Sequence, residues 1–198
     1  MKTSRVISRF RGELTRRYGR EEAVTMIDGA QLEYNRALME YCHLPDGVFW
    51  HGKKTIFPMA CIYHQLHLNH PKEALEVTET VMRRRSESIG RFLNVLMAIP
   101  GMKSLAMKLL PRFVNRYFGP NNGFEVRLAR EPDAFYADFT KCPYQVLTAR
   151  MRCPELCAVF CRSDEYAYGA LRGLRFTRTQ TLGTGGEKCD FCIRRADR

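Results

Sequence analysis

Residues 174–194 read LRFTRTQTLGTGGEKCDFCIR, which has the pattern of two strands joined by a turn. Strand-forming residues occupy both ends, and glycines gather between them. We therefore predict a β-hairpin with strands at 174–182 and 188–194 that turns through 183–187.

The pattern upstream of the hairpin predicts two more strands and two helices. Apolar residues alternate at Phe124, Val126 and Leu128 after a loop rich in glycine and asparagine, which is typical of a strand. Pro154 suits the first position of a helix. The expected elements are strands at 124–128 and 135–139, then helices at 143–151 and 154–171.

The first 118 residues have a helical period, with proline or glycine at the breaks. The expected helices cover 21–41, 55–68, 72–99 and 102–117. The chain is therefore an α+β protein, in which a helical N-terminal half precedes a four-stranded antiparallel sheet with two helices between its strand pairs, ββααββ. The expected organisation is an arm at 1–20 and one domain at 21–198, divided into a helical part at 21–118 and a sheet part at 124–195.

Composition narrows the class of protein. The chain has 198 residues, 45% of them hydrophobic and 27% charged, which suits a folded domain with a core. No apolar run approaches the roughly 20 residues of a membrane span, and the N-terminus lacks the apolar stretch of a secretory signal. We expect a cytoplasmic protein whose eight cysteines are thiols rather than disulfides.

Residues 1–20 form a basic segment. They hold seven lysines and arginines against Glu13 alone, a net charge of +6 out of +11 for the chain. Apolar residues recur four apart at Val6, Phe10, Leu14 and Tyr18, which predicts an amphipathic helix. Such an arm suits an anionic membrane surface or an acidic partner, or else packs its apolar stripe on its own domain. No nucleic-acid-binding motif is present, and we expect no nucleic-acid partner.

Six of the eight cysteines lie between Cys142 and Cys192. A spacing of four predicts that Cys153, Cys157 and Cys161 share one stripe of a helix, which Asp164 continues. Cysteine is also among the most buried residue types, so core packing is the alternative for each thiol. The two aspartates also have structural alternatives: a salt bridge for Asp164, and stabilisation of the hairpin turn for Asp190.

These motifs resemble the L-2-amino-thiazoline-4-carboxylic acid hydrolase family. The resemblance rests on Cys142-Pro143-Tyr144, Pro154-Glu155-Leu156-Cys157, Cys161 with Asp164, Arg178-Thr179-Gln180-Thr181-Leu182, Gly185-Gly186 and Cys189-Asp190-Phe191. Position 192 is a cysteine in this chain, whereas the family usually has arginine or histidine at this position. Membership implies a cytoplasmic bacterial enzyme that opens the ring of 2-aminothiazoline-4-carboxylate to N-carbamoyl-cysteine, in a route of cysteine biosynthesis. The tail also resembles, less closely, the 4-vinyl reductase-type small-molecule-binding domains.

Ring opening needs a nucleophile at the carbon between nitrogen and sulfur, a proton for the nitrogen, and a stabilised thiolate. Either a cysteine thiolate attacks this carbon, or a carboxylate activates water. An arginine at position 162, 175 or 178 is expected to lower a thiol's pKa or to hold the carboxylate of the substrate. We assign catalysis to Cys161, Asp164, Cys142, Cys189 and Asp190, and substrate binding to Arg178, Thr181 and Tyr144.

Two alternatives remain open from sequence. The first is a structural zinc ion held by Cys157, Cys161, Cys189 and Cys192, whereas the hydrolase hypothesis needs no cofactor. Residues 189 and 192 would point to opposite faces of a regular strand, which disfavours this ligand set. The second is a non-enzymatic ligand-binding or sensory module. Under the hydrolase hypothesis, the partner is a small substrate that bears a carboxylate.

Overall fold

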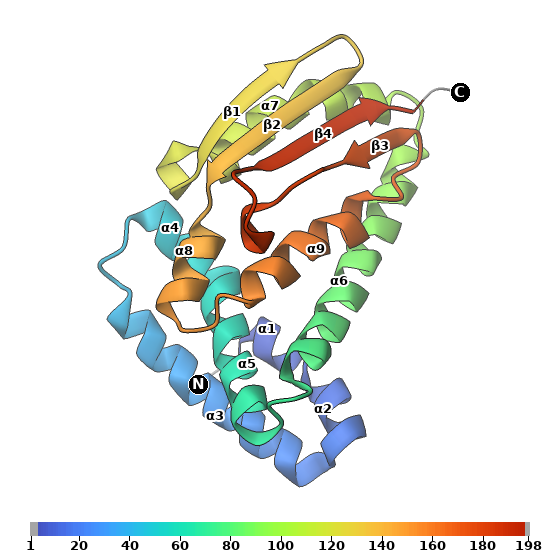
Figure 1. Ribbon diagram of the computed structural model, residues 1–198. Coiled ribbons are helices and arrows are strands. Elements are labelled where there is room, and N and C mark those ends of the chain that lie inside the picture. Colours follow the sequence, from blue (N-terminus) through green and yellow to red (C-terminus); the bar gives the residue numbers. More distant parts are fainter. Residues whose placement is uncertain (1–3, 197–198) are drawn as a thin grey trace.

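A computed structural model describes residues 4–196, and its first half is helical (Figure 1). Within this range no helix is long and apolar enough to cross a membrane. Residues 1–3 of the expected arm and 197–198 of the expected domain lie outside the described residues. The elements before the sheet are α1 (Arg5–Ser8), α2 (Arg11–Tyr18), α3 (Arg20–Glu40), α4 (Asp46–His51), a π-helical turn η1 (Gly52–Ile56), α5 (Phe57–Asn69), α6 (Ala74–Met97) and α7 (Met102–Phe118).

Three of the four expected N-terminal helices are confirmed within two residues by α3, α6 and α7. The helix expected at 55–68 begins earlier, because α4, η1 and α5 form one nearly continuous helical stretch from Asp46. Gly47 and Gly52 weaken the helical pattern at the start of this stretch. A side chain at position 52 would collide with the Phe57 ring, since an added Cβ would lie 2.3 Å from it.

The second half confirms the expected ββααββ order. A short 3-10 turn η2 (Pro120–Asn122) leads into β1 (Glu125–Arg130), β2 (Ala134–Lys141), α8 (Pro143–Arg150), α9 (Leu156–Tyr168), β3 (Leu174–Thr177), a 3-10 turn η3 (Leu182–Thr184) and β4 (Cys189–Arg195). The spatial order is β1-β2-β4-β3, and every neighbouring pair is antiparallel. The two hairpins therefore join through β2 and β4 at the centre of the sheet.

One face of the sheet is apolar and packs against helices. Phe139 pairs with Cys189, and Ala137 with Phe191, so these side chains share the inner face. They form one core cluster with residues of α7 and with Cys161 of α9. In Figure 1, α7 lies behind the sheet and α9 runs beneath it. The next residue along β4, Asp190, points to the outer face.

The strand β3 is shorter than expected, because it ends at Thr177 rather than at residue 182. The backbone N–H groups of Thr179 and Gln180 donate to the Asp190 carboxylate, at 3.0 and 2.8 Å, instead of to a neighbouring strand. The Thr181 side chain then caps the turn η3. Residues 178–188 are therefore an ordered loop, and this loop approaches α9.

The cysteine stripe is only partly confirmed. Cys157 and Cys161 lie on α9, but this helix begins at Leu156, so Cys153 lies in the preceding turn and Pro154 is not its first residue. The Cys153 N–H instead bonds to the Thr148 carbonyl. Cys153 is fully buried in the core of the helical half, where it serves as packing.

Residues 4–20 are part of the core rather than a free arm. Ile7, Phe10 and Leu14 are completely buried, and Val6 is nearly so. The helix is also interrupted, because α1 ends at Ser8 and α2 begins at Arg11. The apolar stripe therefore packs on its own domain, which was one of the two sequence alternatives, and it is not free to enter a membrane.

A buried carboxylate ties this segment to α6. The Glu13 side chain is 1% exposed, and it accepts hydrogen bonds from Arg16, from Arg17 at 2.7 Å and from Arg84 of α6 at 2.6 Å. Burial alone would raise the Glu13 pKa, but the three arginines outweigh it and lower the pKa to about 2.

The Glu13 contact makes the stability of the protein sensitive to acid. A carboxyl whose pKa falls on folding contributes stability above its unfolded pKa, and this stability is lost as the pH drops toward the folded pKa. The shift from 4.5 to about 2 corresponds to about 3 kcal/mol at neutral pH. We expect Glu13→Gln to lose about this much and to flatten the decline in stability between pH 5 and pH 2, measured by urea unfolding.

Glu87→Gln is the matched control, since Glu87 also faces an arginine on α6 but is 46% exposed. It should change the free energy of unfolding by less than about 0.5 kcal/mol. Equal effects of the two substitutions would contradict a structural role for Glu13.

Candidate active site

The Thr181 hydroxyl joins two of the predicted catalytic thiols. It donates to the Cys161 sulfur at 2.8 Å and accepts from the Cys189 thiol at 3.3 Å. The Leu182 N–H also donates to the Cys189 sulfur, at 3.2 Å. Helix α9, the loop 178–188 and strand β4 thus each place one polar side chain at a common point, as the sequence motifs predicted.

A glycine allows the loop to lie directly on α9. A Cβ atom added at Gly183 would lie 2.9 Å from the Cys161 sulfur and 3.0 Å from the Ala158 backbone nitrogen. Both contacts are closer than packed atoms allow, so a side chain here would push the loop away. The contact between Thr181 and Cys161 therefore depends on glycine at position 183.

Asp164 lies one turn of α9 beyond Cys161 and faces Arg178 of the loop. The Arg178 guanidinium lies 3.7 Å from the Asp164 carboxylate, and it also bonds to Glu165 at 2.5 Å and to the Cys161 carbonyl at 3.2 Å. Burial raises the Asp164 pKa to about 7, against the lowering effect of Arg178. Asp164 is therefore a carboxyl group that gains and loses its proton near neutral pH.

Cys142 and Tyr144 come from the start of α8 and approach the same region. Cys142 has electrostatic interactions with Cys161 and Cys189, and Tyr144 has them with Cys142 and Asp164. Cys142 is half-buried, and burial raises its pKa to about 12. The structure thus brings Cys142, Tyr144, Cys161, Asp164, Arg178, Thr181 and Cys189 together.

His51 is a positioning residue that the sequence motifs did not reveal. Burial lowers its pKa, so the ring is neutral. Its Nε2 lies 2.8 Å from the Tyr117 carbonyl, which only accepts, so Nδ1 accepts from the Tyr144 hydroxyl at 3.3 Å. These partners lie 66 and 93 residues from His51, and no local spacing signals them.

Asp190 lies outside this cluster and organises the loop instead. Its carboxylate accepts from the Thr179 hydroxyl at 2.5 Å as well as from two backbone N–H groups. Burial would raise its pKa, but these hydrogen bonds outweigh it and lower the pKa. This geometry supports the sequence alternative of a turn-stabilising residue rather than the catalytic assignment.

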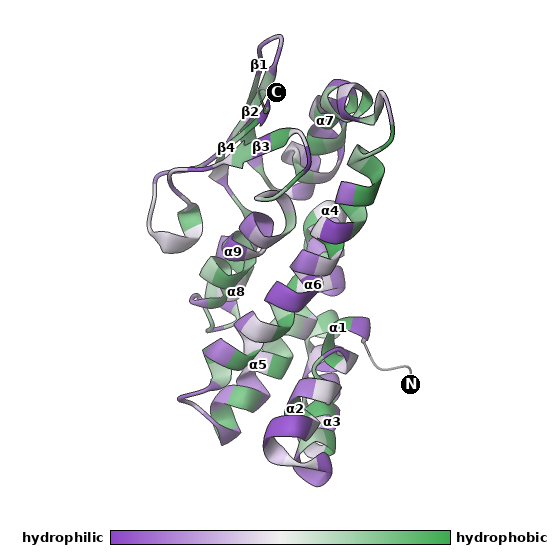
Figure 2. Ribbon diagram, turned by 90° about the vertical axis from the view of Figure 1, so that its right-hand side faces the viewer, coloured by the Kyte–Doolittle hydropathy of each residue, from purple (hydrophilic) through white to green (hydrophobic). Residues whose placement is uncertain are grey.

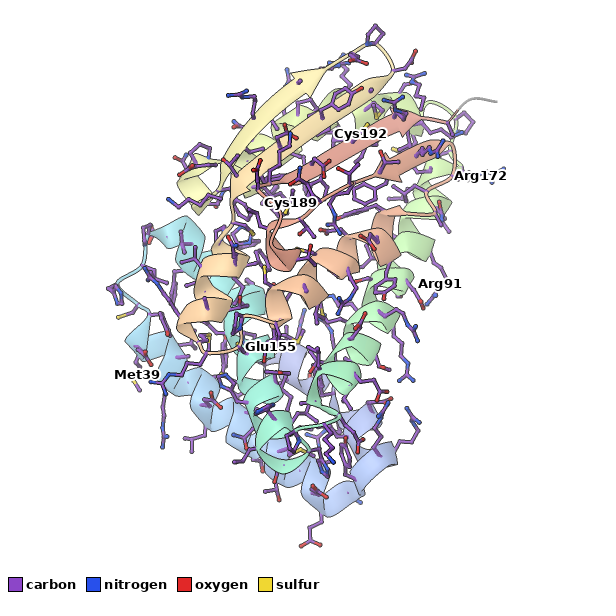
Figure 3. All side chains as sticks on the ribbon, viewed as in Figure 1. Met39, Arg91, Glu155, Arg172, Cys189 and Cys192 are labelled. Carbon is purple, nitrogen blue, oxygen red and sulfur yellow. The ribbon has the colours of Figure 1, made fainter. Side chains whose placement is uncertain are left out.

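The four cysteines of the zinc alternative do not gather. Cys189 faces α9, whereas Cys192 pairs with Tyr136 and Thr177 and points to the outer face of the sheet (Figure 3). Among residues 4–196 no group of three or more histidine, cysteine or acidic side chains is arranged to hold a metal ion. Side chains alternate between the two faces of the sheet along β4, so Cys189 and Cys192 point to opposite faces and cannot bind one metal ion together.

The expectation of an activated thiolate is wrong for the three clustered cysteines. A hydrogen bond with the Cys157 thiol raises the Cys161 pKa, and burial adds to it, although Cys189 and Thr181 act in the opposite direction. A hydrogen bond with Cys161, followed by burial, raises the Cys189 pKa strongly. With Cys142 also raised, these groups are neutral thiols at physiological pH, suited to donating hydrogen bonds.

The fold and the cluster define an α+β protein in which one carboxyl group, one arginine and neutral thiols gather between α9, the loop 178–188 and β4. A family model described as L-2-amino-thiazoline-4-carboxylic acid hydrolase matches residues 51–193, and the chain belongs to this family. The match includes every residue of the cluster, as well as His51. The search of curated proteins found no match.

The raised thiol pKa values predict slow alkylation. Thiolates react with iodoacetamide and thiols do not, so Cys142, Cys161 and Cys189 should be modified more slowly than the exposed Cys42 at pH 7.5. Mass-spectrometric mapping of the native protein over time measures the order, and urea-unfolded protein provides the control in which all sites react alike. Modification of Cys161 before Cys42 would contradict the neutral state assigned to it.

Proposed function

We propose that the protein hydrolyses a 2-aminothiazoline-4-carboxylate-type ring to an N-carbamoyl-cysteine-type product. The observation that carries the proposal is the position of Asp164, one helical turn from Cys161 and beside Arg178, where burial raises its pKa to about 7. Of the two routes considered from sequence, this arrangement favours water activated by a carboxylate over direct attack by a thiolate.

Asp164 serves as the base and then as the acid. Its carboxylate takes a proton from water, and the resulting hydroxide attacks the ring carbon between nitrogen and sulfur. Asp164 returns this proton to the ring nitrogen, which gives a tetrahedral intermediate. The carbon–sulfur bond then breaks with its electron pair on sulfur, the new hydroxyl forms the carbonyl, and its proton passes to the sulfur.

The neutral thiols act on the leaving sulfur. Cys142 and Cys161 carry their protons, so Cys142 has an S–H to donate to the developing thiolate, and Cys161 donates to it in place of its hydrogen bond with Cys157. Cys189 already donates to Thr181, and it holds the Thr181 hydroxyl toward Cys161. Cys189 is therefore a positioning residue, and stabilisation of the sulfur falls to Cys161 and Cys142.

Three arginines were candidates for the substrate carboxylate. Arg162 is already paired with Glu79 through two hydrogen bonds, at 2.7 and 2.8 Å, and Arg175 lies on the outer face of the sheet. Arg178 is also paired, with Glu165, but it is the one of the three that lies beside Asp164 and Cys161, where it holds the Asp164 pKa lower than burial alone would. The hydroxyl groups of Tyr144 and Thr181 supply further polar contacts for the substrate.

Replacement of Asp164 tests the proposal directly. Purified protein should release a free thiol from 2-aminothiazoline-4-carboxylate, and Asp164→Asn should lower kcat/KM by roughly 100-fold or more, because the base is lost. A thiol-specific colorimetric reagent measures the product. Glu131→Gln, a substitution on the hairpin between β1 and β2, is the control and should leave the rate unchanged.

Saturable binding of the thiazoline without turnover would assign the site to a ligand-binding module. Turnover that survives Asp164→Asn would remove Asp164 from the mechanism.

The pH profile tests the role of Arg178. A base with a pKa of about 7 predicts that kcat/KM rises through pH 7 as Asp164 loses its proton. Arg178 lowers this pKa, so Arg178→Met should move the rising limb to higher pH, whereas Arg178→Lys keeps the charge and should move it less. If kcat/KM rises at the same pH in the wild type and in both variants, the group that titrates is not Asp164.

A further inference from the structure

A ridge of large apolar side chains lies exposed on α7 and on the C-terminal part of α6. Of the fifteen large hydrophobic residues exposed within 4–196, seven lie in the 26 residues from 92 to 117. Phe92 is 63% exposed, Val95 69% and Phe113 50%. We call this set the apolar ridge: Phe92, Val95, Ile99, Leu105, Leu109, Phe113 and Tyr117.

Helical spacing explains why the ridge faces outward. Met107 and Val114 of α7 are buried against the sheet, while Leu105, Leu109 and Phe113 recur four apart on another face of the same helix. In Figure 2, α7 and α6 lie on the side of the molecule away from the strands. Large apolar side chains exposed along one row of a helix, such as Leu105, Leu109 and Phe113, mark an interaction site.

The charged residues of the segment that carries the ridge are all basic. Residues 91–118 include five lysines and arginines and no aspartate or glutamate. Within the described part of the chain, none of the five forms an ion pair. The five are Arg91, Lys103, Lys108, Arg112 and Arg116.

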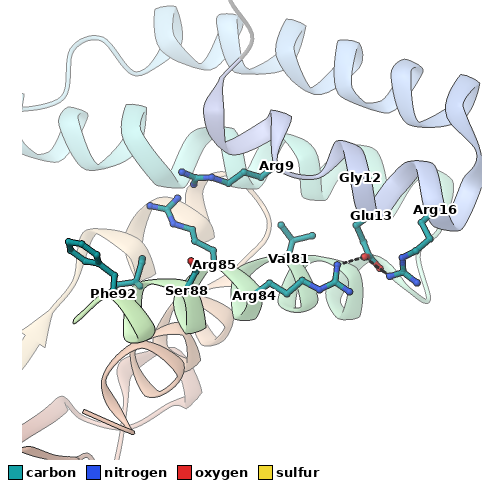
Figure 4. Close-up of a pocket in the computed structure, with 10 residues that line it drawn as sticks. Arg9, Gly12, Glu13, Arg16, Val81, Arg84, Arg85, Ser88 and Phe92 are labelled. Carbon is teal, nitrogen blue, oxygen red and sulfur yellow. Dashed lines mark hydrogen bonds and ion pairs between the residues drawn. The ribbon is translucent and has the colours of Figure 1, made fainter. Parts of the chain in front are cut away.

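An arginine-lined groove adjoins the ridge, because Phe92 belongs to both. The groove lies between α6 and the α1–α2 segment and encloses about 680 Å³ (Figure 4). The guanidinium groups of Arg9 and Arg85 lie close to one another in the groove (Figure 4). Glu13, the acidic residue of the groove, is already bonded to Arg16 and Arg84. Two adjacent guanidinium groups suit a phosphate oxyanion.

We propose that the ridge and the groove together bind the surface of an anionic lipid membrane. The apolar side chains enter the boundary between headgroups and acyl chains, and the surrounding basic residues meet the headgroup phosphates. A second copy of the chain fits less well, because two such surfaces in contact would bring five unpaired cations against five more. No residue of the ridge or the groove belongs to the cluster around Asp164 and Cys161, so the inference does not depend on the proposed reaction.

Residues 4–20 contribute Arg9 to the groove, but the exposed apolar side chains of this surface come from α6, α7 and the turn between them. The segment 4–20 is as basic, but its apolar residues are inside the core. The ridge instead combines exposed aromatic and aliphatic side chains with unpaired cations, which are the two components that interfacial binding requires.

Vesicle co-sedimentation tests the proposal with the full chain. We expect binding to vesicles with roughly one third phosphatidylglycerol to exceed binding to pure phosphatidylcholine by about tenfold or more, and to weaken as NaCl is raised. Leu109→Ser with Phe113→Ser should reduce this binding by about tenfold, since the inserted apolar area is lost. Leu32→Ser with Leu68→Ser is the matched control, because these residues are comparably exposed, at 54% and 76%, on α3 and α5.

Charge reversal provides an independent arm. Lys108→Glu with Arg112→Glu should abolish the preference for anionic vesicles, whereas Arg20→Glu with Lys72→Glu should retain it. Circular dichroism and urea unfolding verify that each variant is folded. The proposal is overturned if the folded wild type ignores anionic vesicles, or if the ridge variants bind them as well as the controls do. A dimer in analytical ultracentrifugation that the Leu109 and Phe113 substitutions dissociate would assign the ridge to a second copy instead.

Discussion

The burial of one face of the sheet against α7 and α9 is the constraint on which the rest of the structure depends. Side chains alternate along a strand, so a single buried face divides β4 into two sets with different roles. Cys189 and Phe191 enter the core, and Cys189 thereby meets Thr181 and Cys161. Asp190 points outward, where it orders the loop that carries Thr181. A shift of one residue in this register would dismantle the site and the loop together.

Burial has opposite consequences for the thiols and for the carboxyl group of the site. For both kinds of acid, removal from water disfavours the charged form and raises the pKa. A thiol that already titrates above neutrality becomes inert as a nucleophile but keeps its proton as a hydrogen-bond donor. The same effect moves Asp164 from the acidic range to about 7, where a general base is most useful. Arg178 limits this shift and prevents the carboxyl group from remaining protonated throughout the physiological range.

The basic residues of the chain serve two different purposes. At Glu13 three arginines neutralise a buried carboxylate and hold α2 on α6, which stabilises the helical half. Along α7 and the end of α6, the basic side chains form no ion pair with any acidic residue among 4–196, and exposed apolar residues lie on the same helices. Net charge alone does not separate these roles, because the difference lies in whether a carboxylate is within reach.

The family match begins at residue 51, yet Ile7, Phe10 and Leu14 complete the core of the same helical half.

Sequence pattern alone predicted the order of the main helices and strands, although not α4 or the extent of β3, because periodicity and turn residues act over a few neighbouring positions. It also determined that Cys161 and Asp164 lie one turn apart, and the motifs around Cys142, Thr181 and Cys189 indicated the rest of the cluster. Only the tertiary structure decided the strand order β1-β2-β4-β3, the partnership of His51 with Tyr144, and the placement of Asp190 on the outer face. It also decided the ionisation of each group and the burial of the N-terminal apolar stripe. These features arise from contacts between residues distant in the chain, and desolvation at such contacts has no counterpart in local spacing.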